Sequence, residues 1–175
     1  MRKIILNLAL SLDGFIEGTR GEYDWCFDDQ DYGLTEFVEG IDALLMGRKT
    51  YETLQSAGTD PFPSKHKYIV STKTIQSNSS ETIIADDFIN AIHRLRKENG
   101  KNLWLFGGAQ LTDALLKEKL VDEFQLSVHP ILLGGGTRLF RDFETRIKLE
   151  LIDCKKYDSG LVQLFYRPNY KRFSE

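Results

Sequence analysis

Short apolar runs alternate with helical patterns along this 175-residue chain, and this alternation constrains its fold more than any other feature. Apolar runs of strand length recur, and amphipathic patterns of helical period lie between most of them. The strands that these runs predict are Ile4–Leu12, Ala43–Met46, Tyr68–Ser71, Thr82–Ala85, Asn102–Phe106 and Glu123–Pro130. The predicted helices are Gln30–Gly40, Lys49–Ser56, a helix capped by Asp86 that runs to about Lys97, and Ala109–Lys117. Such alternation predicts an α/β fold, with a largely parallel sheet that helices cover on both faces.

The C-terminal part of the chain follows a different pattern. Two strand-like segments, Lys148–Tyr157 and Leu161–Arg167, flank the turn-forming residues Asp158-Ser159-Gly160. This arrangement is typical of a β-hairpin, which would add an antiparallel edge and make the sheet mixed. The length of the chain suits one domain over residues 1–175.

Charge and cysteine content exclude several classes of protein. The formal net charge of −3 argues against a nucleic-acid binder, because such proteins carry a basic excess, but it permits an anionic cofactor. The two cysteines, Cys26 and Cys154, lie far apart in no metal-ligand spacing, which favours a reducing compartment and predicts no metal site.

The first apolar run is too short to span a bilayer. We therefore expect a cytoplasmic protein that does not enter a membrane.

Three junctions place small or cationic residues directly after a strand, where open α/β sheets bind ligands. Gly47-Arg48-Lys49-Thr50 combines the amides of a helix start with two positive charges and a hydroxyl, which suits a phosphate group. Gly107-Gly108-Ala109-Gln110-Leu111 places paired glycines where a pyrophosphate can approach the backbone. Ser71-Thr72-Lys73 offers hydroxyls and a lysine to a ribose phosphate. Each pattern is also typical of an ordinary turn with solvated or tightly packed residues.

Acidic residues gather around two aromatic residues, Trp25 and Phe27. One carboxyl group beside an apolar wall can have a raised pKa and relay a proton. The alternative is a solvated loop that leads into a helix, since aspartate favours first turns. The acidic residues are Asp24, Asp28, Asp29, Asp31 and Glu36. The glycine-rich segment Leu133–Gly136 is typical of a flexible turn that could line the site.

Four segments, in matching order and spacing, resemble the dihydrofolate reductase superfamily. They are Ala9–Ile16, Met46–Glu52, Phe106–Ala109 and Val128–Gly136. The likeness is greatest to the bacterial branch that includes the reductase domain of riboflavin biosynthesis. The resemblance implies a dihydrofolate reductase-like, mixed and mostly parallel eight-stranded sheet, with NADPH lying across the strand ends. It also implies a homodimer.

The resemblance assigns roles to the residues of the junctions. Gly47, Arg48, Lys49 and Thr50 would hold the pyrophosphate and adenosine phosphates, and Gly107 to Leu111 would close over the pyrophosphate. Ser71, Thr72 and Lys73 would lie near the ribose 2′-phosphate, which favours NADPH over NADH. Ala9 and Ile16 would lie beside the nicotinamide.

The substrate side departs from true dihydrofolate reductases. These enzymes place an acid about five residues after a tryptophan to bind the pterin, whereas the fifth residue after Trp25 is Gln30. This difference argues against dihydrofolate itself as the substrate. We expect the neighbouring Asp31, or a water near it, to deliver the proton, and Trp25 and Phe37 to form apolar walls.

These observations predict an NADPH-dependent reductase that transfers hydride to a C=N or C=O bond of a small heterocycle. The substrate would be pterin-like or pyrimidine-like. The alternative is a non-catalytic module of the same fold that binds a nucleotide or a pterin. An assay of NADPH oxidation with a panel of such compounds distinguishes the two.

Overall fold

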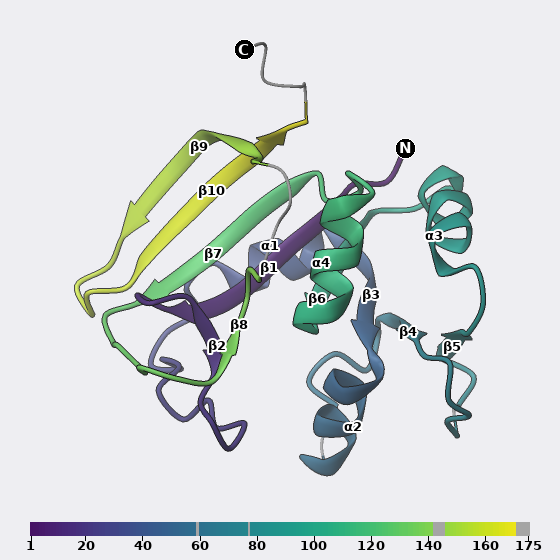
Figure 1. Ribbon diagram of the computed structural model, residues 1–175, viewed down its shortest axis with the longest axis horizontal. Coiled ribbons are helices and arrows are strands. Elements are labelled where there is room, and N and C mark those ends of the chain that lie inside the picture. The colour runs from purple at the N-terminus through teal and green to yellow at the C-terminus, as the bar shows by residue number, and fades with distance from the viewer. Residues whose placement is uncertain (59, 77, 142–145, 171–175) are drawn as a thin grey trace.

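The computed structural model describes residues 1–58, 60–76, 78–141 and 146–170. Its strands in the main sheet are β1 (Ile4–Ser11), β3 (Ile41–Gly47), β4 (His66–Val70), β5 (Glu81–Ile84), β6 (Asn102–Gly107), β7 (Glu123–His129), β9 (Lys148–Lys156) and β10 (Val162–Asn169). These eight strands lie in the order β5-β4-β3-β6-β1-β7-β10-β9 (Figure 1). The neighbours from β5 to β7 run parallel, while β10 pairs antiparallel with both β7 and β9. The mixed, mostly parallel sheet and its C-terminal hairpin are confirmed.

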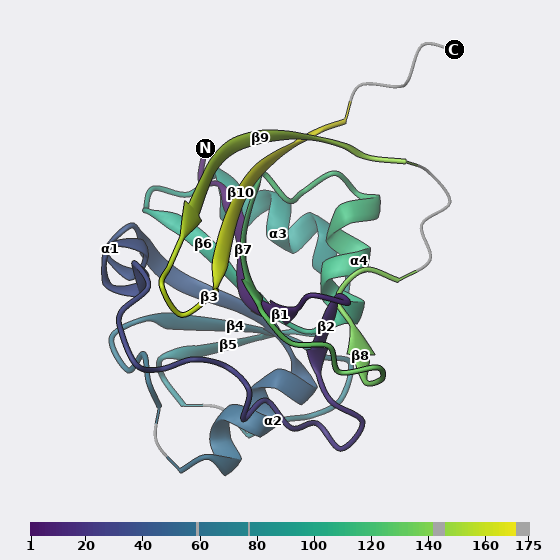
Figure 2. The same ribbon diagram turned by 90° about the vertical axis from the view of Figure 1, so that its left-hand side faces the viewer.

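Helices cover both faces of the parallel part of the sheet (Figure 2). They are α1 (Leu34–Glu39), α2 (Arg48–Ser56), α3 (Phe88–Lys97) and α4 (Ala109–Lys117). Successive side chains of a strand point to opposite faces, and β6 shows the consequence. Leu103 and Leu105 pack in one apolar cluster with Leu115 of α4, whereas Trp104 packs in a second cluster with Tyr51 of α2.

The connections of β3 and β6 leave the sheet in opposite directions. Helix α2 leads from β3 to β4, toward the β5 edge, and α4 leads from β6 to β7, past β1. β3 and β6 are nevertheless neighbours, with Met46 in register with Gly107. The beginnings of α2 and α4 are therefore adjacent, at the kind of switch point where open α/β sheets bind ligands.

Helix α1 is shorter than the sequence predicts, beginning at Leu34 rather than at Gln30. Tyr32 and Gly33 have φ angles of 49° and 78°, so the chain is in the left-handed region just before the helix. The N-cap of α3 is Asp87, also left-handed at a φ of 48°, so the prediction that Asp86 caps this helix is wrong. The beginnings of α1 and α3 therefore depend on local backbone geometry, which hydrophobic periodicity does not predict.

A second, two-stranded sheet was not predicted from the sequence. It pairs β2 (Phe15–Glu17) with β8 (Thr137–Arg138) in antiparallel fashion. Both strands are too short to show a period of two. Their pairing brings the segment after β1 against the glycine-rich segment that follows β7. In the part of the chain that the structure describes, no helix is long and apolar enough to cross a membrane.

Candidate functional site

Two glycines bring the beginnings of α2 and α4 together. Gly47 precedes α2 and Gly108 precedes α4 as the N-cap residues. A Cβ atom at Gly108 would lie 3.6 Å from the Gly47 amide nitrogen and 3.5 Å from the Thr50 Oγ1. The φ of Gly108 is +98°, which L side chains rarely adopt. The structure thus brings together two junctions that lie about 60 residues apart in the sequence.

This paired helix start has the chemistry of an anion site. The first-turn amides of a helix have no acceptor within the helix, and the N-terminus carries the positive end of its dipole. Glycine at both N-caps leaves the amides of Arg48 to Thr50 and of Ala109 to Leu111 without a capping side chain. Two such N-termini side by side, with a hydroxyl between them, fit the pyrophosphate of a dinucleotide.

The two cationic residues at the start of α2, Arg48 and Lys49, differ in their contacts. The Arg48 Nη1 contacts both carboxylate oxygens of Glu52, at 2.5 Å and 2.7 Å, so this guanidinium has an internal partner. Lys49 is exposed. The carboxylate of Glu52 therefore competes with any phosphate for Arg48.

The turn after β4 lies beside the same helix start, since Val70 is in register with Gly47. The buried Ser71 hydroxyl accepts from the Lys73 amide at 3.0 Å and donates to the Lys73 carbonyl at 2.9 Å. Ser71 thus shapes the turn, while Thr72 and Lys73 are exposed. Of the three predicted residues, the last two present their side chains to solvent.

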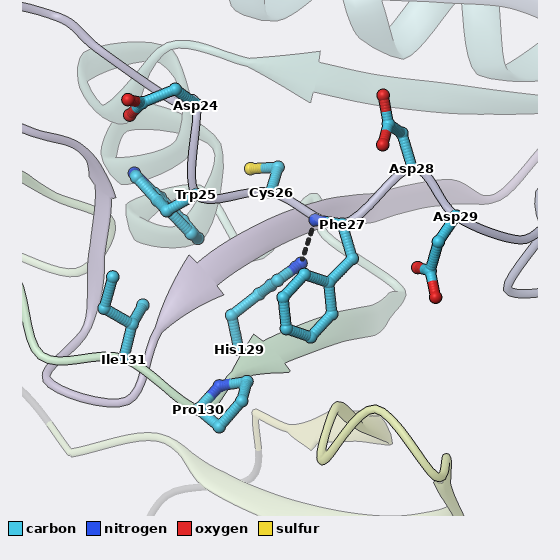
Figure 3. Close-up of a pocket in the computed structure, with 9 residues that line it drawn as sticks. All are labelled: Asp24, Trp25, Cys26, Phe27, Asp28, Asp29, His129, Pro130 and Ile131. Carbon is cyan, nitrogen blue, oxygen red and sulfur yellow. Dashed lines mark hydrogen bonds between the residues drawn. The ribbon is translucent and has the colours of Figure 1, made fainter.

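A cavity of about 460 Å³ lies at the same edge of the sheet, beyond β1 (Figure 3). Ser11 at the end of β1 is in register with His129 at the end of β7, and the cavity begins at this level. Its lining residues are Asp24, Trp25, Cys26, Phe27, Asp28, Asp29, His129, Pro130 and Ile131. The half-buried Ala9 of β1 pairs with Ser127 in the strand next to the cavity, while Ile16 packs against the core from β2.

His129 fastens the loop over residues 24–29 to the end of β7. The Phe27 amide donates to the His129 Nε2 at 3.1 Å, and the Nδ1 donates to the Ser127 carbonyl at 3.0 Å. Trp25 and Phe27 pack edge-on against the imidazole, with centroids at 5.2 Å and 5.0 Å. Burial lowers the pKa of His129, which favours the neutral ring that these two bonds require. Sequence reasoning gave His129 no role, although its place beside Pro130 at a strand end was a signal.

The structure separates the predicted substrate residues. Trp25 lines the cavity, but Phe37 and Asp31 are not among the described residues that do so. Phe37 packs edge-on against Trp104, with ring centroids 5.0 Å apart, in the core cluster beneath α1 and α2. Its apolar partner is therefore the core rather than a substrate.

Asp31 has a structural partner at the start of α1. Its Oδ1 accepts from the Thr35 hydroxyl at 2.7 Å and from the Thr35 amide at 3.0 Å. These bonds lower the pKa of Asp31, the hydroxyl bond contributing most. A carboxyl group with a lowered pKa remains ionised near neutral pH. The hydrogen bonds of Asp31 therefore do not favour the role of proton donor that we expected for it.

Asp13 fixes the glycine-rich segment that the sequence suggested was a flexible turn. Its Oδ1 accepts from the Ser11 hydroxyl at 2.6 Å and from the Leu133 amide at 3.1 Å, while its Oδ2 accepts from the Gly134 amide at 2.8 Å. The Ser11 bond, aided by the Gly134 and Leu133 amides, lowers the pKa of Asp13 to about 2. The segment that follows β7 is therefore tied to the end of β1.

Comparison with known proteins places this arrangement in a family. The chain matches the RibD C-terminal domain over residues 2–163. It is 40% identical to the uncharacterized protein YyaP of Bacillus subtilis (strain 168), in an alignment that covers 96% of both chains.

Solved structures share the fold. A protein from Shewanella sp. PV-4 with a proposed part in riboflavin biosynthesis superposes with a TM-score of 0.85 at 28% identity, over 95% of this chain and 99% of that one. A diaminohydroxyphosphoribosylaminopyrimidine deaminase/5-amino-6-(5-phosphoribosylamino)uracil reductase from Thermotoga maritima gives a TM-score of 0.76 at 14% identity. This second match covers 96% of this chain and 57% of that one, and it bears on the fold alone. The resemblance drawn from the sequence is confirmed, and the chain belongs to the RibD C-terminal domain family, with its dihydrofolate reductase-like fold.

Proposed function

We propose that this protein is an NADPH-dependent reductase that transfers hydride to a C=N or C=O bond of a small heterocyclic substrate. One observation carries the proposal: the glycine-lined helix starts at Gly47 and Gly108 lie on the same sheet edge as the cavity at His129. An anion site beside an aromatic-lined cavity is what a dinucleotide and its substrate require. The Shewanella relative, with its proposed part in riboflavin biosynthesis, supports a pyrimidine-like or pterin-like substrate.

The strand order supports one path for the two proposed ligands. The residues that we propose bind phosphate follow β4, β3 and β6, whereas the cavity follows β1 and β7. Strand β1 lies between β6 and β7, so a dinucleotide that extends from the helix starts toward the cavity must cross the end of β1. Ala9 and Ile16 would then lie beside the nicotinamide. NADPH, when bound, supplies the hydride.

The residues of the chain would bind, orient and exclude water. The first-turn amides of α2 and α4 would hold the pyrophosphate, and Thr72 and Lys73 would receive the 2′-phosphate. Trp25 and Phe27, held by His129, would shield the reacting atoms from bulk water. Alignment of two bound reactants in this way supplies much of the rate enhancement of a hydride transfer.

We assign proton delivery to water in the cavity rather than to Asp31. The Asp31 carboxylate is bonded to Thr35 and its pKa is lowered. His129 carries its proton on Nδ1, where the Ser127 carbonyl accepts it. Neither group is arranged to donate. That neither Asp31 nor His129 is arranged to donate a proton also favours the second candidate function, a non-catalytic module that binds a nucleotide or a pterin.

NADPH oxidation by the intact protein distinguishes the two functions. The protein is incubated with NADPH and a panel of pterins, pyrimidine ribosylamines and small carbonyl compounds, and the absorbance of the reduced nicotinamide is followed. Turnover of one panel member supports the reductase. NADPH binding with no turnover on the whole panel supports the binding module.

We also propose that the protein is a homodimer in which β9 pairs with its copy. All nine residues of this edge strand are exposed, including Leu149, Leu151 and Ile152. The outer side of an edge strand offers backbone N–H and C=O groups for pairing, and the strand carries charges of both signs, Glu150 and Lys155 among them, so an antiparallel copy can match them. Light scattering should give twice the chain mass, and Leu151→Lys should give the monomer. A monomeric wild-type protein would contradict this proposal.

A further inference from the structure

The loop over residues 24–29 is attached to the sheet at its C-terminal end as well as in its middle. Gln163 of β10 donates from Nε2 to the backbone carbonyl of Tyr32, just beyond the loop, at 2.8 Å. The same Nε2 donates to the Ser127 hydroxyl of β7 at 3.2 Å, and the Gln163 Oε1 accepts from the Tyr157 hydroxyl at 2.8 Å. Both polar atoms of this half-buried amide therefore have protein partners, which fix its orientation.

These bonds join those of His129 in one continuous chain of contacts. The Phe27 amide donates to the imidazole of His129 (Figure 3), and the imidazole donates to the Ser127 carbonyl. The chain continues from the Ser127 hydroxyl to Gln163, and from Gln163 to the Tyr32 carbonyl. The segment from Phe27 to Tyr32 is thus held at both ends by β7 and β10.

The turn between β9 and β10 holds the side chain of Tyr32. Its ring packs edge-on against Tyr157, with ring centroids 4.8 Å apart. Its hydroxyl forms hydrogen bonds with the Ser159 hydroxyl at 2.9 Å and with the Oδ1 of Asp29 at 2.7 Å. Tyr32 therefore connects the end of the loop to the tip of the C-terminal hairpin.

The tip of the hairpin also lies against the cavity wall. A Cβ atom at Gly160 would be 3.3 Å from the Cγ of Pro130, which lines the cavity. The Gly160 amide donates to the Tyr157 carbonyl at 2.9 Å, and the Tyr157 amide donates to the carbonyl of the buried Leu161 at 3.0 Å. Internal bonds thus close the turn on which Tyr32 rests.

The backbone of Tyr32 is in a conformation that a tyrosine rarely adopts. Its φ is 49°, and that of the next residue, Gly33, is 78°. The left-handed region suits glycine, whereas a residue with a bulky side chain is disfavoured there. The contacts with Gln163, Tyr157 and Ser159 offset this cost. Backbone outliers of this kind cluster at functional sites, where the surrounding structure holds them.

We propose that Tyr32 and Gln163 are positioning residues, which hold the loop over residues 24–29 in place so that Trp25 and Phe27 enclose the substrate. This inference rests on the proposed reductase function and extends the site to the C-terminal hairpin. Neither residue is among the described residues that line the cavity. Both act through the loop, because Gln163 fixes the carbonyl of Tyr32 and Tyr32 fixes the end of the segment that begins at Phe27.

Alkylation of Cys26 measures the position of the loop without any substrate. Cys26 lines the cavity, and burial, with a contribution from the charge of Asp24, raises the pKa of its thiol to about 11, so it reacts slowly while the loop is in place. The other cysteine is exposed and is removed by Cys154→Ser. In this background, Tyr32→Phe and Gln163→Leu should each raise the rate of alkylation by iodoacetamide at least about threefold, through local opening. An unchanged rate in both variants would overturn the proposal.

Tyr170→Phe is the matched control for the loss of a tyrosine hydroxyl. The Tyr170 hydroxyl donates to the Val121 carbonyl at 2.7 Å, at the opposite end of β7 from the cavity. This variant should lose stability to a similar extent as Tyr32→Phe and leave the alkylation of Cys26 unchanged. Equal acceleration in Tyr170→Phe would show that global unfolding controls the reaction, and would overturn the proposal.

Steady-state kinetics tests whether the position of the loop matters to the substrate. For the panel compound that is reduced, Tyr32→Phe and Gln163→Leu should each raise KM at least about fivefold, because the loop encloses the bound substrate. The Kd of NADPH should stay within about twofold of the wild-type value, since the helix starts at Gly47 and Gly108 lie beyond β1 from the cavity. A wild-type KM in both variants would overturn the role in substrate binding. If no panel compound is reduced, the result counts against the proposed function, whereas alkylation still decides whether the two residues hold the loop.

Discussion

The amide nitrogen of Gly47 lies 3.6 Å from the point that a Cβ atom would occupy at Gly108. This proximity brings the N-terminal ends of α2 and α4 together, although one helix follows β3 and the other follows β6. Both N-caps are glycine, and no side chain caps the first-turn amides of either helix. The proposed cofactor site depends on this relationship.

The first prediction concerns the backbone at Gly108. Gly108→Ala should weaken NADPH binding by about tenfold or more, since its φ of +98° suits only glycine and the added methyl group would fill the space beside Thr50. The strain should also reduce the free energy of unfolding by about 1–3 kcal/mol. Calorimetric titration with NADPH, together with chemical unfolding, measures both effects.

Gly58→Ala is the matched control for this strain. Gly58 also has a positive φ, +74°, but it lies beyond the C-terminal end of α2 with nothing within 4 Å of an added Cβ atom. The control should lose stability and retain NADPH affinity. Equal loss of affinity in both variants would mean that strain, rather than the site, explains the first result.

The second prediction concerns selectivity between cofactors. Lys73→Ala should weaken NADPH binding by about tenfold and leave NADH binding nearly unchanged, because charge-assisted bonds to a phosphate are worth about 1.5–3 kcal/mol. Lys97→Ala, which removes an exposed lysine on α3, should affect neither cofactor. Dissociation constants for both cofactors give the ratio. A parallel loss of NADH binding would remove Lys73 from 2′-phosphate recognition.

The third prediction follows from the ion pair within α2. Glu52→Gln should strengthen NADPH binding by about threefold, since it frees Arg48 and removes a negative charge near the phosphates. The gain should fall as salt is added. Weaker binding in this variant would show instead that Glu52 positions Arg48 for the cofactor.

The fourth prediction concerns pH and Asp13. The Ser11 hydroxyl and the Leu133 and Gly134 amides lower the pKa of this carboxyl group from 3.8 to about 2. A depressed folded-state pKa contributes stability above the unfolded-state value, and this contribution is lost as the pH falls from about 4 toward 2. Asp13→Asn should therefore have a lower melting temperature than the wild type at pH 7, with the difference shrinking in this acidic window. A difference that is independent of pH would contradict the linkage.

The strand and helix pattern was predictable because it rests on repeated local signals. The alternation that located β1, β3, β6 and β7 extends over many residues, and the glycines at 47 and 107–108 mark strand ends that a parallel sheet places on the same edge. The order of the strands in the sheet could not be predicted from any single segment. β6 lies between β3 and β1, and hydrophobic periodicity does not indicate which strands are neighbours.

The substrate side was harder to predict, because it depends on single long-range contacts. His129 meets Phe27 across 102 positions of the chain. Phe37 was expected in the pocket on the basis of its apolar character, but an apolar residue on a helix satisfies the core equally well. Asp31 was expected to donate a proton, whereas its hydrogen bonds with Thr35 fit the beginning of a helix. The sequence alone does not distinguish a core position from a pocket wall for Phe37, or a contact at a helix start from a proton donor for Asp31.

The stability of the protein in the presence of NADPH tests the central claim most directly. A ligand that binds only the native state stabilises it by about 2.7 kcal/mol at a concentration one hundred times its Kd. For a chain of this size this corresponds to a rise in Tm of roughly 5–10 °C. We predict such a rise with NADPH for the wild type and a rise of about half that size or less for Gly108→Ala. A wild-type Tm that does not change with NADPH would contradict the proposed cofactor site.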